Sequence, residues 1–524
     1  MRRRQFITGL GTVGALGATD LAAAQPANST TTTGGGQINN VILAIGDGMG
    51  FDPIEITAHV HGDLALQSMT PVGLTRTFPR DGSVTDSAAA GTALATGMQA
   101  HNGQVSVRGP AGSEDVTPIT TLLEVANQIG KATGLVSTTR ITHATPAVFG
   151  SHIYDRDLER DIADQYLEQE VDVLLGGGRR EWSRDQLDRA SAAGYEILSD
   201  RSDLMAASSD QLLGLFDQSH VTYTLDRDDS IPSLLEMSQT AFDRLAGDDG
   251  CFLLIEGGRI DHAEHGNDIQ TTVAETREFD EVVAWGREVV ARRDDTLLIV
   301  TSDHETGGLA TGDDYGAPLK TEAIRQANGS NTAIAAAIER GVPIREAVSR
   351  SVDVSLTDAE VERIDEARTR DSPYALSNTI GEVVSDHLGV TWASHNHTGP
   401  AQTVLAAGPG VTPATAWRHH TDLSATMAAL VLFGQIPDTT DVSRSNWEQR
   451  ITTSGPNGVH DAQLALQYVG PADSAVRRAL DVNDDGFVDY ADVLSIGGTA
   501  VTSASERAAR PTRRRVSTDQ YHTL

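Results

Sequence analysis

Five short apolar runs, each followed within three residues by glycine or an acidic residue, constrain the fold of this chain more than any other feature. They are NNVILAIGDGMG (strand expected at 41–45), VDVLLGGG (171–178), CFLLIEGG (251–258), TLLIVTSD (296–303) and TVLAAGPG (403–410). Polar segments with helical patterning separate them, for example 233–246 and 268–293. Buried strands that alternate with helices predict an α/β fold. We expect a three-layer sandwich with a large, mostly parallel central sheet flanked by helices.

The ends of these runs carry the side chains that bind metals. The candidates are Asp47, Glu256, Asp261, His265, Asp303, His304 and His397, with His143 and His262 close by in the sequence. Ligands collect at the carboxyl ends of strands in parallel sheets, and a mixture of carboxylates and imidazoles suits zinc. Asp261 and His265 are four residues apart, so a helix would place both on one face. Carboxylates that converge without a cation carry a severe charge penalty, so we predict a metal site.

The stretch SVTDSAAAGTALATG (83–97) places a serine after an aspartate at the start of a helical pattern. Serine is a preferred helix N-cap, so Ser87 is either a capping residue or a nucleophile at a helix start. Two neighbouring metal ions would ionise its hydroxyl and hold the leaving oxygen of a substrate. Free backbone N–H groups at a helix N-terminus also favour an anion. We therefore predict that Ser87 attacks a phosphate and forms a phosphoserine.

From about residue 38 to 435 the chain resembles alkaline phosphatases. Six motifs occur in the order of that family: IGDGMG, VTDSAAAGTALATG, THATPAVFGSHIYDR, IEGGRIDHAEHGN, VTSDHETGG and NHTG. The resemblance implies that Ser87 is the nucleophile, in contact with the metals, and that Arg156 grips the phosphate oxygens. It implies two Zn²⁺ ions, the first on Asp261, His265 and His397, the second on Asp47, Asp303 and His304. It also implies a third metal, Mg²⁺, on Asp47, Thr145 and Glu256.

Two histidines stand where some bacterial members of that family have aspartate and lysine. His262 would contact the phosphate directly or through water. His143 would bind the third metal or lie beside it, which leaves magnesium or a softer ion as the occupant; the alternative is a surface histidine bonded to a carboxylate.

The resemblance implies a hydrolase that releases inorganic phosphate from small phosphate monoesters, and it suggests a homodimer. A phosphodiesterase of the same superfamily is the alternative. The arginine clamp and the third metal favour the monoester, because both serve its extra charged oxygen. A sulfatase is disfavoured, since no sulfatase-type motif surrounds Ser87.

The charge of the chain excludes some partners. There are 73 acidic and 40 basic residues, a net charge of −33, and the lysines are Lys131 and Lys320. Such a surface repels nucleic acid and anionic membranes, so we expect neither as a partner. Acidic excess with few lysines resembles proteins of salt-loving organisms, haloarchaea above all. Cys251 is the single cysteine, which rules out an intrachain disulfide.

The ends of the chain have their own character. Residues 1–24 resemble a twin-arginine-type export signal and 25–37 a flexible linker, so we expect an extracellular or cell-surface protein. We assign 38–440 to the catalytic domain, with 315–390 as a helix-rich insertion over the sheet. The basic end, 501–524, is expected to be disordered.

The segment DVNDDGFVDYAD (481–492), within a predicted unit at 455–500, has the spacing of an EF-hand calcium loop and resembles a dockerin repeat. Its Ca²⁺ ligands would be Asp481, Asn483, Asp485, the carbonyl of Phe487, Asp489 and Asp492. A cohesin-type partner is disfavoured, because the upstream repeat is degenerate. A secreted calcium-dependent binding protein would explain this loop, but it leaves Ser87 and the predicted zinc ligands without a role.

Overall fold

The computed structural model describes residues 37–311, 318–411, 417–434, 448–449, 451–453, 455–456 and 459–497. The predicted signal (1–24), all of the predicted linker except residue 37, and the predicted tail (501–524) lie outside these residues. Within the described part of the chain, no helix is both long and apolar enough to cross a membrane.

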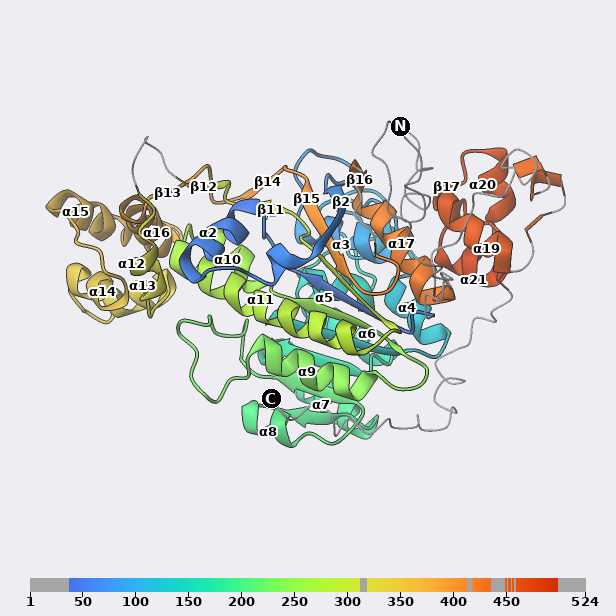
Figure 1. Cartoon of the computed structure of the whole chain (residues 1–524), viewed down its shortest axis with the longest axis horizontal. Helices are drawn as coiled ribbons and strands as arrows, with labels where there is room; N and C mark the ends of the chain where they lie inside the picture. Colours follow the sequence, from blue (N-terminus) through green and yellow to red (C-terminus); the bar gives the residue numbers. More distant parts are fainter. Residues whose placement is uncertain are drawn as a thin grey trace, which may run out of the picture.

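Ten strands form one central sheet, in the order β16, β2, β15, β10, β1, β9, β5, β6, β8, β7 (Figure 1). Their bounds are β16 (Trp417–His419), β2 (Thr70–Arg76), β15 (Gln402–Ala407), β10 (Thr296–Thr301), β1 (Asn40–Ile45), β9 (Cys251–Glu256), β5 (Ala132–Arg140), β6 (Val173–Gly177), β8 (Leu212–Leu215) and β7 (Glu196–Leu198). Neighbouring strands are parallel except at β10–β15 and β15–β2, so β15 alone runs against the others. The prediction of a large, mostly parallel sheet is confirmed.

The five apolar runs correspond to β1, β6, β9, β10 and β15. The direction of the last run differs from the expectation: Leu298 of β10 pairs with Ala407 in antiparallel register. The loop after β15 therefore lies at the opposite edge of the sheet from the loops that follow β1, β9 and β10.

Helices cover both faces of the sheet, because alternate residues of its strands enter two different cores. Val41, Leu43 and Ile45 of β1 belong to the first core, whereas Ile42 and Ala44 belong to the second. The first core is closed by α3 (Ser87–Thr96), α4 (Leu122–Gln128), α5 (Ala144–Gly150), α6 (Glu159–Glu168), α7 (Arg184–Ala192) and α17 (His420–Phe433). The second is closed by α8 (Arg201–Ala206), α9 (Leu234–Leu245), α10 (Arg259–His265) and α11 (Ile269–Arg292). This is the expected three-layer arrangement.

The helix-rich insertion forms a lobe at one end of the molecule (Figure 1). It contains α12 (Thr321–Arg325), α13 (Asn331–Glu339), α14 (Ile344–Ser351), α15 (Asp358–Ala367) and α16 (Ala375–Leu388). A third core joins these helices to α11 and to α2 (Phe51–His61), through residues such as Ile56 and Val273. No strand of the central sheet contributes to this core. The expectation that the insertion lies over the sheet is therefore wrong; it extends the helical layer beyond the sheet.

The C-terminal unit, 459–497, packs beside α17 and α4. It contains α19 (Val459–Ala465), α20 (Ala475–Leu480), the strands β17 (Gly470–Pro471) and β18 (Phe487–Val488), and α21 (Tyr490–Ile496). Leu480, Val488 and Tyr490 are fully buried and belong to the first core. The unit therefore shares the main core, although the sequence suggested a separate appendage.

Candidate active site

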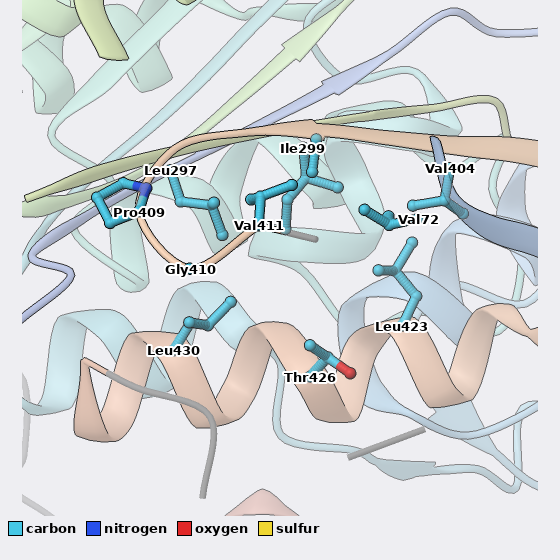
Figure 2. Close-up of a pocket in the computed structure, with 11 residues that line it drawn as sticks. Val72, Leu297, Ile299, Val404, Pro409, Gly410, Val411, Leu423, Thr426 and Leu430 are labelled. Atoms are coloured by element: carbon cyan, nitrogen blue, oxygen red, sulfur yellow. The ribbon is translucent and has the colours of Figure 1, made fainter. Parts of the chain in front are cut away.

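An apolar cavity lies between α17 and the sheet, and its lining carries no chemistry. Leu423 and Leu430 of α17 point toward Ile299 and Val404 of the sheet, as Figure 2 shows. Among the lining residues the one polar side chain is that of Thr426. With no acid, base or metal ligand on its walls, this cavity is a packing gap.

Four adjacent strands bring acidic and imidazole side chains to one edge of the sheet. Asp47 follows β1 by two residues, Glu256 ends β9, and Asp303 follows β10 by two residues. His143 lies between β5 and α5. Because β10, β1, β9 and β5 are neighbours and parallel, their carboxyl ends meet at this edge.

Three groups of ligand-bearing side chains form there. They are Asp47 with Asp303 and His304, Asp47 with His143 and Glu256, and Asp261 with His265 and His397. Within each group the ligand atoms lie within 4.8 Å of one another. Asp47 belongs to the first two groups and therefore connects them.

The first two groups contain buried oxygens that fit divalent cations. Both carboxylate oxygens of Asp47, Oδ2 of Asp303, Oε1 of Glu256 and Oγ1 of Thr145 are buried without a hydrogen-bond partner. Burial, and then the charge of Asp303, raise the pKa of Asp47 well above its ordinary value. Burial also raises the pKa of Asp303 to about 8. Buried carboxylates without donors need a cation to become stable as anions, and these oxygens are suitable ligands.

The third group has imidazoles that are oriented for metal binding. Nε2 of His265 and Nε2 of His397 are 3.1 Å apart, and they lie 3.4 and 3.6 Å from Oδ1 of Asp261. Their Nδ1 atoms contact the carbonyl oxygens of His395 and Thr85. Donation from Nδ1 to a carbonyl leaves the Nε2 lone pair available to a metal. Burial alone would raise the pKa of Asp261, but the neighbouring imidazoles lower it overall.

Ser87 is the first residue of α3, and it does not cap the helix. The N-cap is Asp86, whose Oδ1 accepts a hydrogen bond from Ala89 N at 2.8 Å. The Ser87 side chain is free to point into the site, where its Oγ lies 3.2 Å from Nε2 of His304. The capping interpretation of Ser87 is therefore wrong, and the sequence pattern that suggested it is satisfied by the preceding aspartate.

Arg156 contacts the N-cap residue of α3 and is held from two sides. Its Nη1 donates to Oδ2 of Asp86 at 3.0 Å, and its Nη2 contacts Nε2 of His143 at 3.0 Å. Oδ2 of Asp86 also accepts from the backbone N–H of Gly103. Burial, and then the charge of Arg156, lower the pKa of His143 well below its ordinary value. His143 is therefore a neutral imidazole, the form that binds metals.

Comparisons with known proteins show the family to which the chain belongs. Residues 38–432 match the family model described as alkaline phosphatase. This match spans most of the chain. The chain belongs to the alkaline phosphatase family.

Individual relatives and solved structures of this family are similar to the chain over most of its length. The chain is 34% identical over 395 residues to alkaline phosphatase 3 of Bacillus subtilis. The aligned region covers 71% of this chain and 84% of that protein. The crystal structure of Thermus thermophilus alkaline phosphatase has a TM-score of 0.70 and 30% identity, over 79% of this chain and 96% of that one. The crystal structure of the cold-active alkaline phosphatase from Shewanella sp. has a TM-score of 0.69 and 29% identity, over 75% of this chain and 99% of that one. The chain is therefore a hydrolase of the alkaline phosphatase family.

A cluster of three imidazoles borders the site, and its third member was missed from the sequence. The rings of His143 and His262 lie 5.5 Å apart, and the ring of His220 lies 4.2 Å from His262 and 5.5 Å from His143. Nη1 of Arg259 contacts Nδ1 of His262 at 2.8 Å. His220 follows the apolar stretch QLLGLF, which contains β8. The rule that polar residues after an apolar run face the site would have found it.

The predicted calcium loop lies in the C-terminal unit, away from the three groups above. The carboxylate of Asp481 accepts from the backbone N–H groups of residues 485 and 486, and Asn483 Oδ1 also accepts from residue 485. Asp485 forms an ion pair with Arg108 at 2.8 Å, and the same guanidinium lies over the ring of Phe487. Asp489 caps α21, and Asp492 accepts from the backbone at both ends of the loop. Calcium binding by this loop stays a prediction.

Proposed function

We propose that this chain hydrolyses phosphate monoesters by attack of the Ser87 hydroxyl on phosphorus. The observation that carries this proposal is the position of Ser87 Oγ at the N-terminus of α3, 3.2 Å from His304 Nε2. A hydroxyl with no capping task, next to a metal-ligating group, is placed for nucleophilic attack. The orphan N–H groups of the first helical turn favour the negative charge of the phosphate.

The ligand groups fit three divalent cations. We assign one Zn²⁺ to Asp261, His265 and His397, a second to Asp47, Asp303 and His304, and a third ion, Mg²⁺ or a softer metal, to Asp47, Glu256 and Thr145 with His143. Bound cations of this kind supply positive charge that acidifies a hydroxyl and neutralises phosphate oxygens.

In this proposal Arg156 binds the phosphate and Ser87 attacks it. Two of the N–H groups of Arg156 are engaged with Asp86 and His143, and its other N–H groups can donate to two phosphate oxygens. The Ser87 oxygen forms a bond to phosphorus while the bond from phosphorus to the ester oxygen breaks, and the alcohol leaves with a proton. Water then attacks the phosphoserine, which restores the hydroxyl of Ser87 and releases inorganic phosphate.

Hydrolysis of p-nitrophenyl phosphate by the full chain in molar salt, loaded with zinc and magnesium, tests this proposal. We expect turnover that is lost after chelation and in Ser87→Ala. Ser238→Ala is the matched control, because Ser238 is a buried serine on α9 whose hydroxyl donates to the Leu234 carbonyl of the same helix. Faster hydrolysis of bis-p-nitrophenyl phosphate than of the monoester would indicate the diesterase instead. Full activity of Ser87→Ala would refute the phosphoserine route.

We further propose that the enzyme works outside the cell in concentrated salt. The twin-arginine-type pattern of residues 1–24 and the net charge of −33 support this. Salt screens the repulsion between surface carboxylates, so the melting temperature should rise between dilute buffer and molar salt. A melting temperature that does not depend on salt would contradict the adaptation to salt.

A further inference from the structure

Arg259 differs from the other arginines around the site in its partners. Arg140 pairs with Glu159, Arg156 with Asp86 and Arg180 with Glu181. Within the described part of the chain, Arg259 forms no ion pair with a carboxylate. Its guanidinium instead lies over the ring of Tyr223, 3.6 Å from the centroid, and Nη1 lies 2.8 Å from Nδ1 of His262.

The contact with Arg259 determines which nitrogen of His262 carries the proton. A guanidinium has only N–H donors and stays charged, so Nδ1 of His262 must accept the hydrogen bond. A neutral imidazole that accepts at Nδ1 carries its proton on Nε2. Nε2 of His262 has no hydrogen-bond partner among the described residues, and the side chain is partly exposed. His262 therefore presents an unused N–H donor at the edge of the site.

The packing of Arg259 fixes its direction. Tyr223 is buried, with 8% of its surface exposed, so the ring that supports the guanidinium is itself held by the protein. Stacking of an arginine on an aromatic ring orients the planar group and leaves its N–H edge free to donate. Arg259 and His262 are three residues apart on α10, which places them on neighbouring turns of one helix.

We propose that Arg259 is a positioning residue that holds His262 with its Nε2–H directed at a phosphate oxygen of the substrate. This inference rests on the proposed phosphatase function. Arg259 acts through His262: it fixes the tautomer and the ring orientation, and His262 makes the contact with the substrate. Loss of Arg259 frees Nδ1 to take the proton, which turns Nε2 into an acceptor that repels the phosphate oxygen.

A double-mutant cycle on the metal-loaded full chain tests this role. We expect Arg259→Met and His262→Ala each to lower kcat/KM for p-nitrophenyl phosphate by about tenfold, the worth of one hydrogen bond to a charged group. The double variant should be no worse than His262→Ala alone. Arg259→Lys, which retains a charged donor, should recover most of the activity. Arg180→Met is the matched control: it removes a nearby arginine that pairs with Glu181, and we expect activity to stay unchanged.

The tautomer itself supplies a readout that does not depend on catalysis. In protein labelled with ¹³C- and ¹⁵N-histidine, the signal that disappears in His262→Ala should report the Nε2–H form, and Arg259→Met should shift it toward the Nδ1–H form. Equal losses from Arg259→Met with and without His262, or an unchanged tautomer, would overturn the proposal. Wild-type protein with the expected tautomer but no phosphatase activity would refute the proposed function and leave the positioning of His262 intact.

Discussion

Gly91, in the middle of α3, sets how closely this helix approaches α5. A Cβ at this position would lie 2.7 Å from Cγ2 of Val148. Carbon atoms in good contact are about 3.5–4.0 Å apart. Gly91→Ala therefore requires a shift of about 1 Å at this contact, and because Val148 is fully buried in a close-packed core we expect the two helices to move apart.

The two helices hold different residues of the candidate site, so moving α3 away from α5 should lower activity more than stability. Ser87 begins α3, whereas Thr145 lies in the first turn of α5. Overpacking costs about 1–3 kcal/mol, and the better helix propensity of alanine returns about 1 kcal/mol. A misplacement of about 1 Å between reacting groups costs about a hundredfold in rate. We expect a small loss of stability and a loss of kcat of that order.

Kinetics on four proteins decide the matter: wild type, Gly91→Ala, Val148→Ala and the double variant. Val148→Ala removes the methyl groups that the Cβ introduced by Gly91→Ala would meet, so the double variant should recover most of the lost kcat. Chemical denaturation of the same four proteins separates the loss of stability from the loss of activity. Wild-type kcat in Gly91→Ala, or no recovery in the double variant, would refute the argument that the spacing of these helices positions Ser87.

Two further predictions concern the charges of the site. In the chelated protein, burial raises the pKa of Asp303 to about 8. Its ordinary pKa is about 4, so between these two pH values the folded state binds more protons than the unfolded state. The free energy of unfolding of chelated protein should then fall as pH rises through this window, and loading with zinc should abolish the fall; a flat profile in denaturant titrations of chelated protein would contradict the cost of the buried charge. Asp86→Asn keeps an acceptor for the α3 cap but replaces the oxygen that holds Arg156, so inhibition by inorganic phosphate should weaken about tenfold. The melting temperature should fall as well, because the same oxygen accepts from the backbone N–H of Gly103. Inhibition as strong as in the wild type would show that Arg156 does not depend on Asp86.

The sequence predicted the fold where burial alone decides the structure. The runs that became β1, β9 and β10 are buried throughout and mostly apolar, because both faces of these strands enter a core. The run that became β15 has the same appearance, yet it is antiparallel to β10. Strand direction depends on how the chain returns to the sheet, and local hydrophobicity does not record it. β5, with the sequence ATGLVSTTR, went unnoticed because its buried serine and threonines resemble a loop.

The sequence predicted the candidate metal ligands better than it predicted the residues that support the site. Asp261 and His265 are recognisable because four-residue spacing on a helix is a local property, and the structure brings them together with His397. Groups that act through another residue leave no such trace. Asp86, which both caps α3 and holds Arg156, looks like an ordinary capping residue in the sequence. The partnership of Arg259 with Tyr223 joins two segments that only the folded chain brings into contact.

The C-terminal unit packs against α3 and α17 with residues that the family match does not include. The match ends at residue 432, whereas the first core continues through residues 459–497. Oη of Tyr490 shares a hydrogen bond of 2.7 Å with Oγ of Ser424 on α17, and both residues are fully buried. The same Oη lies against Gly97, which ends α3 in a left-handed conformation; a Cβ there would lie 2.9 Å from it.

Tyr490→Phe tests whether this support reaches the active site. The substitution removes the buried hydrogen bond with Ser424 and leaves its hydroxyl without that partner, which should lower the free energy of unfolding by about 1–3 kcal/mol. The matched variant Tyr490→Phe with Ser424→Ala removes both polar groups and should recover part of that loss. Because the phenyl ring still fills the space beside Gly97, kcat should remain near the wild-type value in both variants. A large loss of kcat in Tyr490→Phe would mean that the hydrogen bond, rather than packing, transmits the position of the C-terminal unit to α3.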